Sequence, residues 1–151
     1  MNRTLAGLLF VAACHHGGAA TVTPRSSGTS AVAAAPDASA VTAQIDQGKA
    51  LYGAKCAKCH GDAGQGTAKG PPVVGKDAFP LEPRPGAKRD TKFHTAADVF
   101  AWATKNMPGD DPASLTTEQY LAVFAFDLTA NGIKLDHPLD AATAQATVLH
   151  P

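Results

Sequence analysis

Two thiols and an imidazole stand close together in the stretch KCAKCHGD. Cys56 and Cys59 are three positions apart, and His60 directly follows the second cysteine. Thiols and an imidazole at this spacing could bind zinc, exchange electrons as a dithiol, form a disulfide, or attach and ligate a haem. On a helical turn, residues three apart share one side, so both thiols could reach the same edge of a flat ligand. The surrounding sequence has to discriminate among these chemistries.

That sequence favours haem attachment. Zinc would ordinarily need four ligands, and only scattered histidines follow Cys59, with no second cysteine pair. A thioredoxin-like dithiol needs a βαβ context that the chain lacks, and a structural disulfide leaves His60 unexplained. C-x-x-C-H is the known attachment signature of a c-type haem. We therefore predict one covalent haem c on Cys56 and Cys59, with His60 as an iron ligand, while zinc, dithiol and disulfide remain as alternatives.

The elements that must position this motif are predicted to be helices. Apolar residues recur at helical spacing from Ala43 to Lys55 and predict a helix that runs into the cysteine motif. Residues 61–91 are rich in Gly and Pro, which predicts a long loop wrapped around a ligand. Capping boxes at Thr95 and Thr116 predict the starts of two more helices, and Gly132 suits the end of the second. Because no useful stretch alternates with period two, we expect an all-α fold.

The first residues have the layout of an export signal. Arg3 precedes an apolar run that ends in small residues before Cys14 and is too short to span a bilayer. The stretch VAAC resembles the lipobox of bacterial lipoproteins, which implies that Cys14 is acylated as a lipid anchor. The alternative is a signal cleaved elsewhere, with Cys14 idle. We expect a signal peptide over residues 1–13 and a lipid-anchored protein in the periplasm or on the cell surface.

Composition divides the remaining chain into three parts. Residues 14–43 are rich in Ala, Ser, Thr, Gly and Pro with almost no large apolar side chain, which predicts a flexible tether. Residues 44–132 are expected to form the folded domain. Residues 133–151 form a C-terminal tail, in which Asp140 is expected to cap a short helix through Leu149. The formal net charge is zero, which gives no indication of a nucleic-acid partner.

The folded part resembles a class I cytochrome c domain. The resemblance covers roughly residues 43–132 and rests on four pieces in family order, GKALYGAKCAKCHGDAGQG, GPPVVG, KNMPG and LTTEQYLAVFAFDLTANG. It implies a small cytochrome c fold, with three main helices and long Gly- and Pro-rich loops around the haem. Gly48 and Tyr52 on the first helix should then meet Val123 and Phe126 on the last, in a close crossing for which glycine leaves room.

The resemblance also implies roles for single residues. Met107, in KNMPG, lies where the family places its axial sulfur, and His/Met ligation raises the reduction potential. The Pro71 carbonyl should accept a hydrogen bond from the free ring nitrogen of His60. Val73 should pack against the porphyrin face, and Trp102 should form part of the haem-pocket wall.

Function is expected to follow from the filled axial positions. A haem iron with both His60 and Met107 as axial ligands can exchange one electron but has no open coordination position for a substrate. We therefore expect an electron carrier rather than an enzyme, which shuttles between a dehydrogenase or quinol-oxidising complex and a terminal acceptor. One alternative is a haem subunit of a periplasmic dehydrogenase complex, with the tail as its docking surface. Another is a haem enzyme or gas sensor with a labile sixth ligand. For the ligand itself, the alternatives are that Met107 only fills the core, or that His94 takes its place.

Charge is unevenly distributed along the chain. Basic residues outnumber acidic ones in the haem-attachment half, and the sign reverses in the later half. Such a dipole could orient the exposed haem edge toward an acidic partner, although solvated surface charge explains it equally well.

Overall fold

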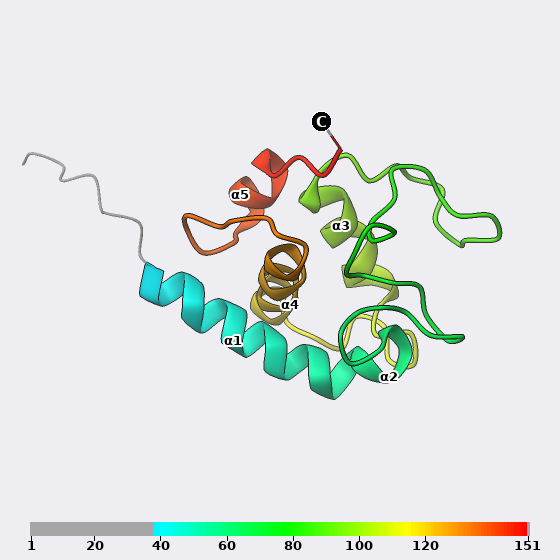
Figure 1. The fold of residues 1–151 in the computed structure, drawn as a ribbon, viewed down its shortest axis with the longest axis horizontal. Helices are drawn as coiled ribbons and strands as arrows, with labels where there is room; N and C mark the ends of the chain where they lie inside the picture. Colours follow the sequence, from blue (N-terminus) through cyan, green and yellow to red (C-terminus); the bar gives the residue numbers. More distant parts are fainter. Residues whose placement is uncertain (1–37, 151) are drawn as a thin grey trace, which may run out of the picture. The chain divides into compact units, whose positions relative to one another are not determined.

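The computed structural model describes residues 38–150, and this part of the chain is helical. Its helices are α1 (Ala38–Lys55), α2 (Ala57–His60), α3 (Ala96–Asn106), α4 (Thr117–Ala130) and α5 (Ala141–Ala146). An irregular loop joins α2 to α3 (Figure 1). The only β pairing within these residues is an isolated bridge between Thr95 and Val148. The expectation of an all-α fold with a long loop is confirmed.

Helix α4 is the central element of this domain. It packs against α1 on one side and α3 on the other, and Figure 1 shows it nearly end-on between them. Its side chains Ala122, Ala125 and Leu128 are at most 1 % exposed. Burial of this apolar face removes hydrocarbon from water, which is the main favourable term in the packing. None of the helices within residues 38–150 combines the length and the apolar character that a membrane span requires.

The crossing of α1 and α4 depends on Gly48. A Cβ atom at this position would lie only 1.9 Å from the Ala122 carbonyl oxygen, so the backbones approach too closely for a side chain. One turn along α1, the Tyr52 ring packs on Phe126 at a centroid distance of 5.3 Å, and both lie against Val123. The contacts that the family resemblance predicted between α1 and α4 are confirmed.

The helix ends follow the local signals in the sequence. The Thr95 hydroxyl accepts a hydrogen bond from the Asp98 backbone N–H while the Asp98 carboxylate accepts from the Thr95 N–H, and Thr116 and Gln119 make the same reciprocal pair. Both predicted capping boxes are therefore present. At the other end of α4, Gly132 has φ of 82° and completes the expected left-handed C-terminal turn.

Helix α1 begins earlier than the sequence predicted. We expected the folded part to start at residue 43 or 44, after a tether, but residues 38–43 belong to α1. Val41 is buried, and the Gln44 side chain donates to the Leu139 carbonyl at 2.9 Å and accepts from the Leu139 N–H at 2.7 Å. The first turns are thus stabilised by the C-terminal tail, a partner that local composition cannot reveal. The signal peptide, Cys14 and the rest of the tether lie outside the described residues.

The C-terminal tail packs on the domain's own core. Asp140 caps α5 as expected, but the helix ends at Ala146 and not at Leu149. Beyond Ala146 the chain is extended, because the Thr147 carbonyl accepts from the Ala96 N–H and the Leu149 N–H donates to the His94 carbonyl. Leu139 and Ala144 in the tail are each 2 % exposed. These contacts make the tail a strap across the start of α3.

Candidate haem-binding site

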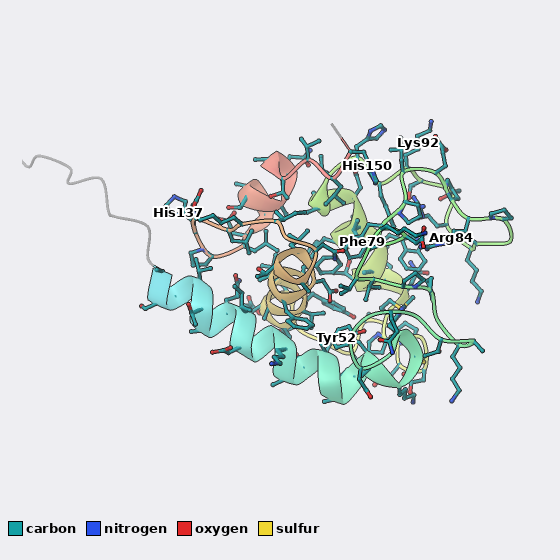
Figure 2. The ribbon with its side chains drawn as sticks, viewed as in Figure 1. Tyr52, Phe79, Arg84, Lys92, His137 and His150 are labelled. Atoms are coloured by element: carbon teal, nitrogen blue, oxygen red, sulfur yellow. The ribbon has the colours of Figure 1, made fainter. Side chains whose placement is uncertain are left out.

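A cavity of about 730 Å³ brings the predicted site residues together. Its volume is typical of a small-molecule or cofactor site. The wall combines the end of α1, the one-turn α2, the long loop, the end of α3 and one face of α4. Tyr52 contributes from α1, and Phe79 and Arg84 contribute from the long loop (Figure 2). All of the cofactor-binding residues predicted from the sequence line it: Cys56, Cys59, His60, Pro71, Val73, Trp102 and Met107.

The cysteine motif forms a single helical turn. The Cys59 and His60 backbone N–H groups both donate to the Cys56 carbonyl, each at 3.0 Å. This turn directs both thiols and the imidazole to the same cavity. Both thiols are free and partly buried. The geometry matches attachment of one flat ligand at two neighbouring points.

The alternative thiol chemistries find little support in this site. Burial, with a smaller contribution from the charge of Asp127, raises the pKa of the Cys56 thiol to about 12. Dithiol exchange requires a thiolate, and the raised pKa lowers the fraction of Cys56 that is in this form. In the part of the chain that the structure describes, no group of three or more His, Cys, Asp and Glu side chains could hold a metal ion.

The His60 ring is held by the loop in front of it. Its Nδ1 lies 2.7 Å from the Pro71 carbonyl oxygen, as expected, and since a carbonyl can only accept, Nδ1 carries the proton. Nε2 is then free to act as a metal ligand. The loop can come this close because residue 70 is glycine: a Cβ there would lie 2.9 Å from the Cys59 carbonyl oxygen and 3.1 Å from His60 Nδ1.

The segment with Pro71 and Val73 is fixed at both of its ends. Before it, the Thr67 hydroxyl donates to the Cys59 carbonyl at 2.6 Å. After it, the Asn131 amide donates to the Val73 carbonyl at 2.8 Å and accepts from the Gly75 N–H at 2.9 Å. Asn131 is the C-cap of α4. The end of α4 and the loop therefore set the orientation of the imidazole together.

Met107 lines the same cavity from the C-terminal end of α3. Its backbone N–H donates to the Ala103 carbonyl at 2.8 Å. Its carbonyl accepts from the Tyr120 hydroxyl, which ties the residue to α4. The rival ligand His94 is exposed and does not line the cavity, and among the described histidines only His60 does. The site geometry thus favours Met107 over His94.

Trp102 forms part of the cavity wall, as expected. It meets Phe93 edge-on at a centroid distance of 6.3 Å. Phe93 is buried in the cluster between α3, α4 and the tail. Trp102 therefore packs against the hydrophobic core on one side and lines the cavity on the other.

Arg89 is a site residue that the sequence did not reveal. It is 8 % exposed and lines the cavity. Its guanidinium donates to four backbone carbonyls of the long loop and lies 3.7 Å from the centre of the Phe93 ring. Those carbonyls belong to Pro80, Leu81, Glu82 and Thr91. Nothing in the local sequence RPGAKRDTK signals this role, because the partners are backbone atoms.

Asp127 also lines the cavity and was not predicted. Its side chain is buried in α4, and its Oδ1 has no hydrogen-bond partner. Burial raises the pKa of this carboxyl to about 8. A signal did exist, since a lone acidic residue interrupts the apolar run YLAVFAFDL.

The residues present fit a haem c. Two unpaired thiols lie one helical turn apart beside an imidazole whose Nε2 is free, and a thioether residue lines the same cavity from another helix. Thiols for covalent attachment and an imidazole as an axial ligand are donors that such a group uses, and a thioether is one of the groups that can supply a second axial ligand. The wall also contains aromatic and aliphatic side chains suited to a porphyrin face.

Comparison with known proteins agrees with this geometry. The family model described as cytochrome c oxidase, cbb3-type, subunit III matches residues 43–126, more than half of the chain. No curated protein matches the sequence. Among solved structures, a chain of the crystal structure of the sulfane dehydrogenase SoxCD from Paracoccus pantotrophus superposes with a TM-score of 0.54. That match is 28 % identical and covers 70 % of this chain and 52 % of the other, so the present chain aligns with about half of its neighbour.

Sequence motif, fold and cavity lead to the same assignment. The chain belongs to the cytochrome c oxidase, cbb3-type, subunit III family, and its folded part is a class I cytochrome c domain whose cofactor is haem c.

Proposed function

We propose that this protein is a membrane-tethered periplasmic electron carrier with one haem, ligated by His60 and Met107. The observation that supports it most is the meeting of both residues on one cavity with Cys56 and Cys59. When bound, haem c supplies a reversible one-electron couple at its iron. Transfer of electrons is the activity that the cytochrome c domain indicates.

The residues of the chain hold the ligands in place. The Pro71 carbonyl keeps the proton on His60 Nδ1, and the Tyr120 hydroxyl secures the backbone of Met107. Ligands fixed in this way need to move little when the charge in the site changes. An occupied sixth position also leaves no place for a substrate or gas.

Replacement of Met107 by alanine tests the ligand assignment. Without the thioether, the reduction potential should fall and the reduced protein should bind carbon monoxide, because a neutral sulfur ligand favours the reduced state. Spectroelectrochemistry and a carbon monoxide titration measure both effects. His94→Ala is the matched control and should leave the potential unchanged, since His94 is exposed outside the cavity. Avid carbon monoxide binding by the reduced wild type would instead favour the gas-sensor or enzyme alternative.

The tether proposal rests on the sequence before residue 38. The signal layout and the lipobox-like VAAC agree with a site of haem attachment outside the cytoplasm. In an export-competent bacterial host, the wild type should fractionate with membranes, and Cys14→Ser should release mature, haem-loaded protein into the soluble periplasmic fraction. Equal membrane association of both proteins would rule out Cys14 as the anchor.

Electron-transfer partners are proposed to be other redox proteins with acidic surfaces. More basic than acidic side chains line the cavity, and the exposed ones among them would favour such a surface at low salt. Association rates with a candidate partner should therefore decrease as ionic strength rises. The basic residues that line the cavity are Lys55, Lys69, Arg84, Lys88, Arg89 and Lys105.

A fixed place in a dehydrogenase complex is the second candidate. The likeness to a chain of a sulfane dehydrogenase structure favours it. In that case the protein should co-purify with a catalytic subunit at high salt, whereas a mobile carrier should dissociate. The tail's contacts with its own core leave other faces of the domain to form such an interface.

A further inference from the structure

Asp127 is a buried carboxyl inside the haem cavity. It is 5 % exposed, and no hydrogen-bond donor reaches its Oδ1 within the described residues. Buried polar atoms in folded proteins are nearly always paired, because an unpaired one retains its full desolvation cost. The cavity wall that includes Asp127 also includes Cys56 and His60. One oxygen of the Asp127 carboxyl is therefore buried without a hydrogen-bond partner on the wall of the cavity that also holds the haem-attachment motif.

The groups around Asp127 do not neutralise it. From the end of α1, the Tyr52 hydroxyl donates to the Gly61 carbonyl at 2.8 Å and is not available to the carboxyl. After burial, the charge of Asp127 is the next cause that raises the pKa of both Tyr52 and Cys56, so these titratable groups face it closely.

No charged residue on the other cavity walls contributes to the shift in the pKa of Asp127, which burial alone causes. The guanidinium of Arg89, from the long loop, is occupied by backbone carbonyls. Lys105, from α3, lines the cavity, but burial is the one cause that shifts the pKa of Asp127. The same holds for the remaining charged lining residues, which are Lys55, Lys69, Arg84, Lys88 and Asp110.

A change in iron charge must affect such a carboxyl. Reduction removes one positive charge from the cavity, and in a poorly solvated site this charge interacts with a buried carboxylate more strongly than it would in water. The oxidised state therefore favours the carboxylate and the reduced state favours the acid. By linkage, a proton that binds more tightly to the reduced protein also makes reduction more favourable.

We propose that Asp127 binds a proton from solvent when the domain accepts an electron and releases it when the electron leaves. This proposal rests on the proposed function, because it requires a reversible one-electron couple in the cavity. The electron would come from a one-electron donor protein and would be held by the haem that Cys56, Cys59 and His60 would bind. The proton forms an O–H bond on the Asp127 carboxylate, and that bond breaks on reoxidation. The domain would thereby transfer electrons and protons together.

The pH dependence of the midpoint potential tests this proposal on the haem-loaded protein. Where the oxidised form is ionised and the reduced form protonated, each pH unit changes the coupled equilibrium tenfold, so the potential should fall by about 59 mV per pH unit. The measurement covers about pH 5 to 10, which lies on both sides of the value of about 8 to which burial raises the pKa of Asp127. Asp127→Asn, which has the same shape but no titrating proton, should remove this slope.

Asp110→Asn is the matched control. Asp110 lines the same cavity but is exposed and pairs with Lys58, a contact that holds the pKa of its carboxyl below the ordinary value. It stays ionised across the tested range, so its neutralisation should shift the potential by a constant amount and preserve the slope. Equal slopes in the wild type and Asp127→Asn would overturn the proposal.

Redox-induced infrared difference spectra give a second, direct readout. Reduction of the wild type should produce the C=O band of a protonated carboxyl, which Asp127→Asn should lack. Should Asp127→Asn fail to mature, Asp127→Leu provides an apolar replacement for the same two measurements. Absence of the band in the wild type would overturn the proposal by itself.

These outcomes are distinct from failure of the proposed function. A carrier with a reversible couple, no carbon monoxide binding and a potential independent of Asp127 would keep the function and reject the proton uptake. A protein without a reversible one-electron couple would reject both.

Discussion

The guanidinium of Arg89 orders the long loop at the scale of a single residue. A planar group with five donors can satisfy several carbonyls at once, and Arg89 reaches four of them while it stacks on Phe93. The loop lacks regular structure, so these bonds replace those that a helix would have supplied. The part of the haem cavity wall that the long loop forms therefore depends on the hydrogen bonds of the Arg89 side chain.

Replacement of Arg89 by lysine should destabilise the protein by about 2–4 kcal/mol. A compact ammonium cannot reach all four carbonyls, so buried acceptors lose their partners. Urea denaturation followed by circular dichroism measures this difference. The neighbouring exposed Lys88 offers the comparison, and Lys88→Ala should change stability by less than about 0.5 kcal/mol. Similar effects of both substitutions would contradict the role of Arg89.

Residues with short-range signatures could be predicted, and those defined by distant partners could not. The spacing of Cys56, Cys59 and His60, together with the sequence around them, predicted haem attachment, and the contact of Pro71 with His60 followed from a family resemblance. Asp127 interrupts an apolar run, but only the fold shows that the run faces the cofactor cavity.

Among the contacts between helices, the close crossing of α1 and α4 is the one that positions the cysteine motif. Both helices present small residues at the contact, Gly48 on α1 and Ala122 on α4, so their backbones meet directly. Two helix backbones can approach this closely only where the residues at the crossing have little or no side chain. The crossing then fixes the end of α1 at Lys55 and the turn with the two cysteines that directly follows it.

Gly48→Ala should therefore destabilise the domain by about 2 kcal/mol or more, because the added methyl group would force the helices apart. Thermal unfolding followed by circular dichroism gives the measurement. Gly53 lies on the same helix, and a Cβ there would meet nothing within 4 Å. Gly53→Ala should stabilise the helix by up to about 1 kcal/mol. A loss of stability in both variants would indicate helix effects unrelated to the crossing.

Element boundaries were predictable where caps are local. The starts of α3 and α4 and the end of α4 follow from Thr95, Thr116 and Gly132. The start of α1 and the end of α5 were wrong by several residues. In both cases the deciding contacts join the tail to segments far away in the sequence, and no local pattern can report them.

The tail completes the core at the scale of the whole domain. Leu139 and Ala144 belong to the cluster of α3 and α4, while Gln44 connects the tail to α1. Chain ends of small domains are often poorly ordered unless they are tied down. Here residues 133–150 are tied to three helices, so the folded unit extends well beyond the family match that ends at residue 126.

Leu139→Ala should cost about 2–5 kcal/mol, the usual range for removal of a fully buried leucine side chain. Val148, in the same tail, is 55 % exposed, and Val148→Ala should cost less than about 0.5 kcal/mol. Denaturation monitored by Trp102 fluorescence in apoprotein and by Soret absorbance in holoprotein can compare the two. If neither substitution matters, the tail contributes little to the core.

The double contact of Asn131 has a consequence for how chains of this kind can vary in length. Since one amide sets both the last turn of α4 and the segment from Val73 to Gly75, an insertion in either would displace the carbonyl that orients His60. Residues 83–88 make no hydrogen bond with the side chain of Asn131 or with that of Arg89. Homologous chains are therefore expected to gain and lose residues in that span while the spacing from His60 to Gly75 stays constant.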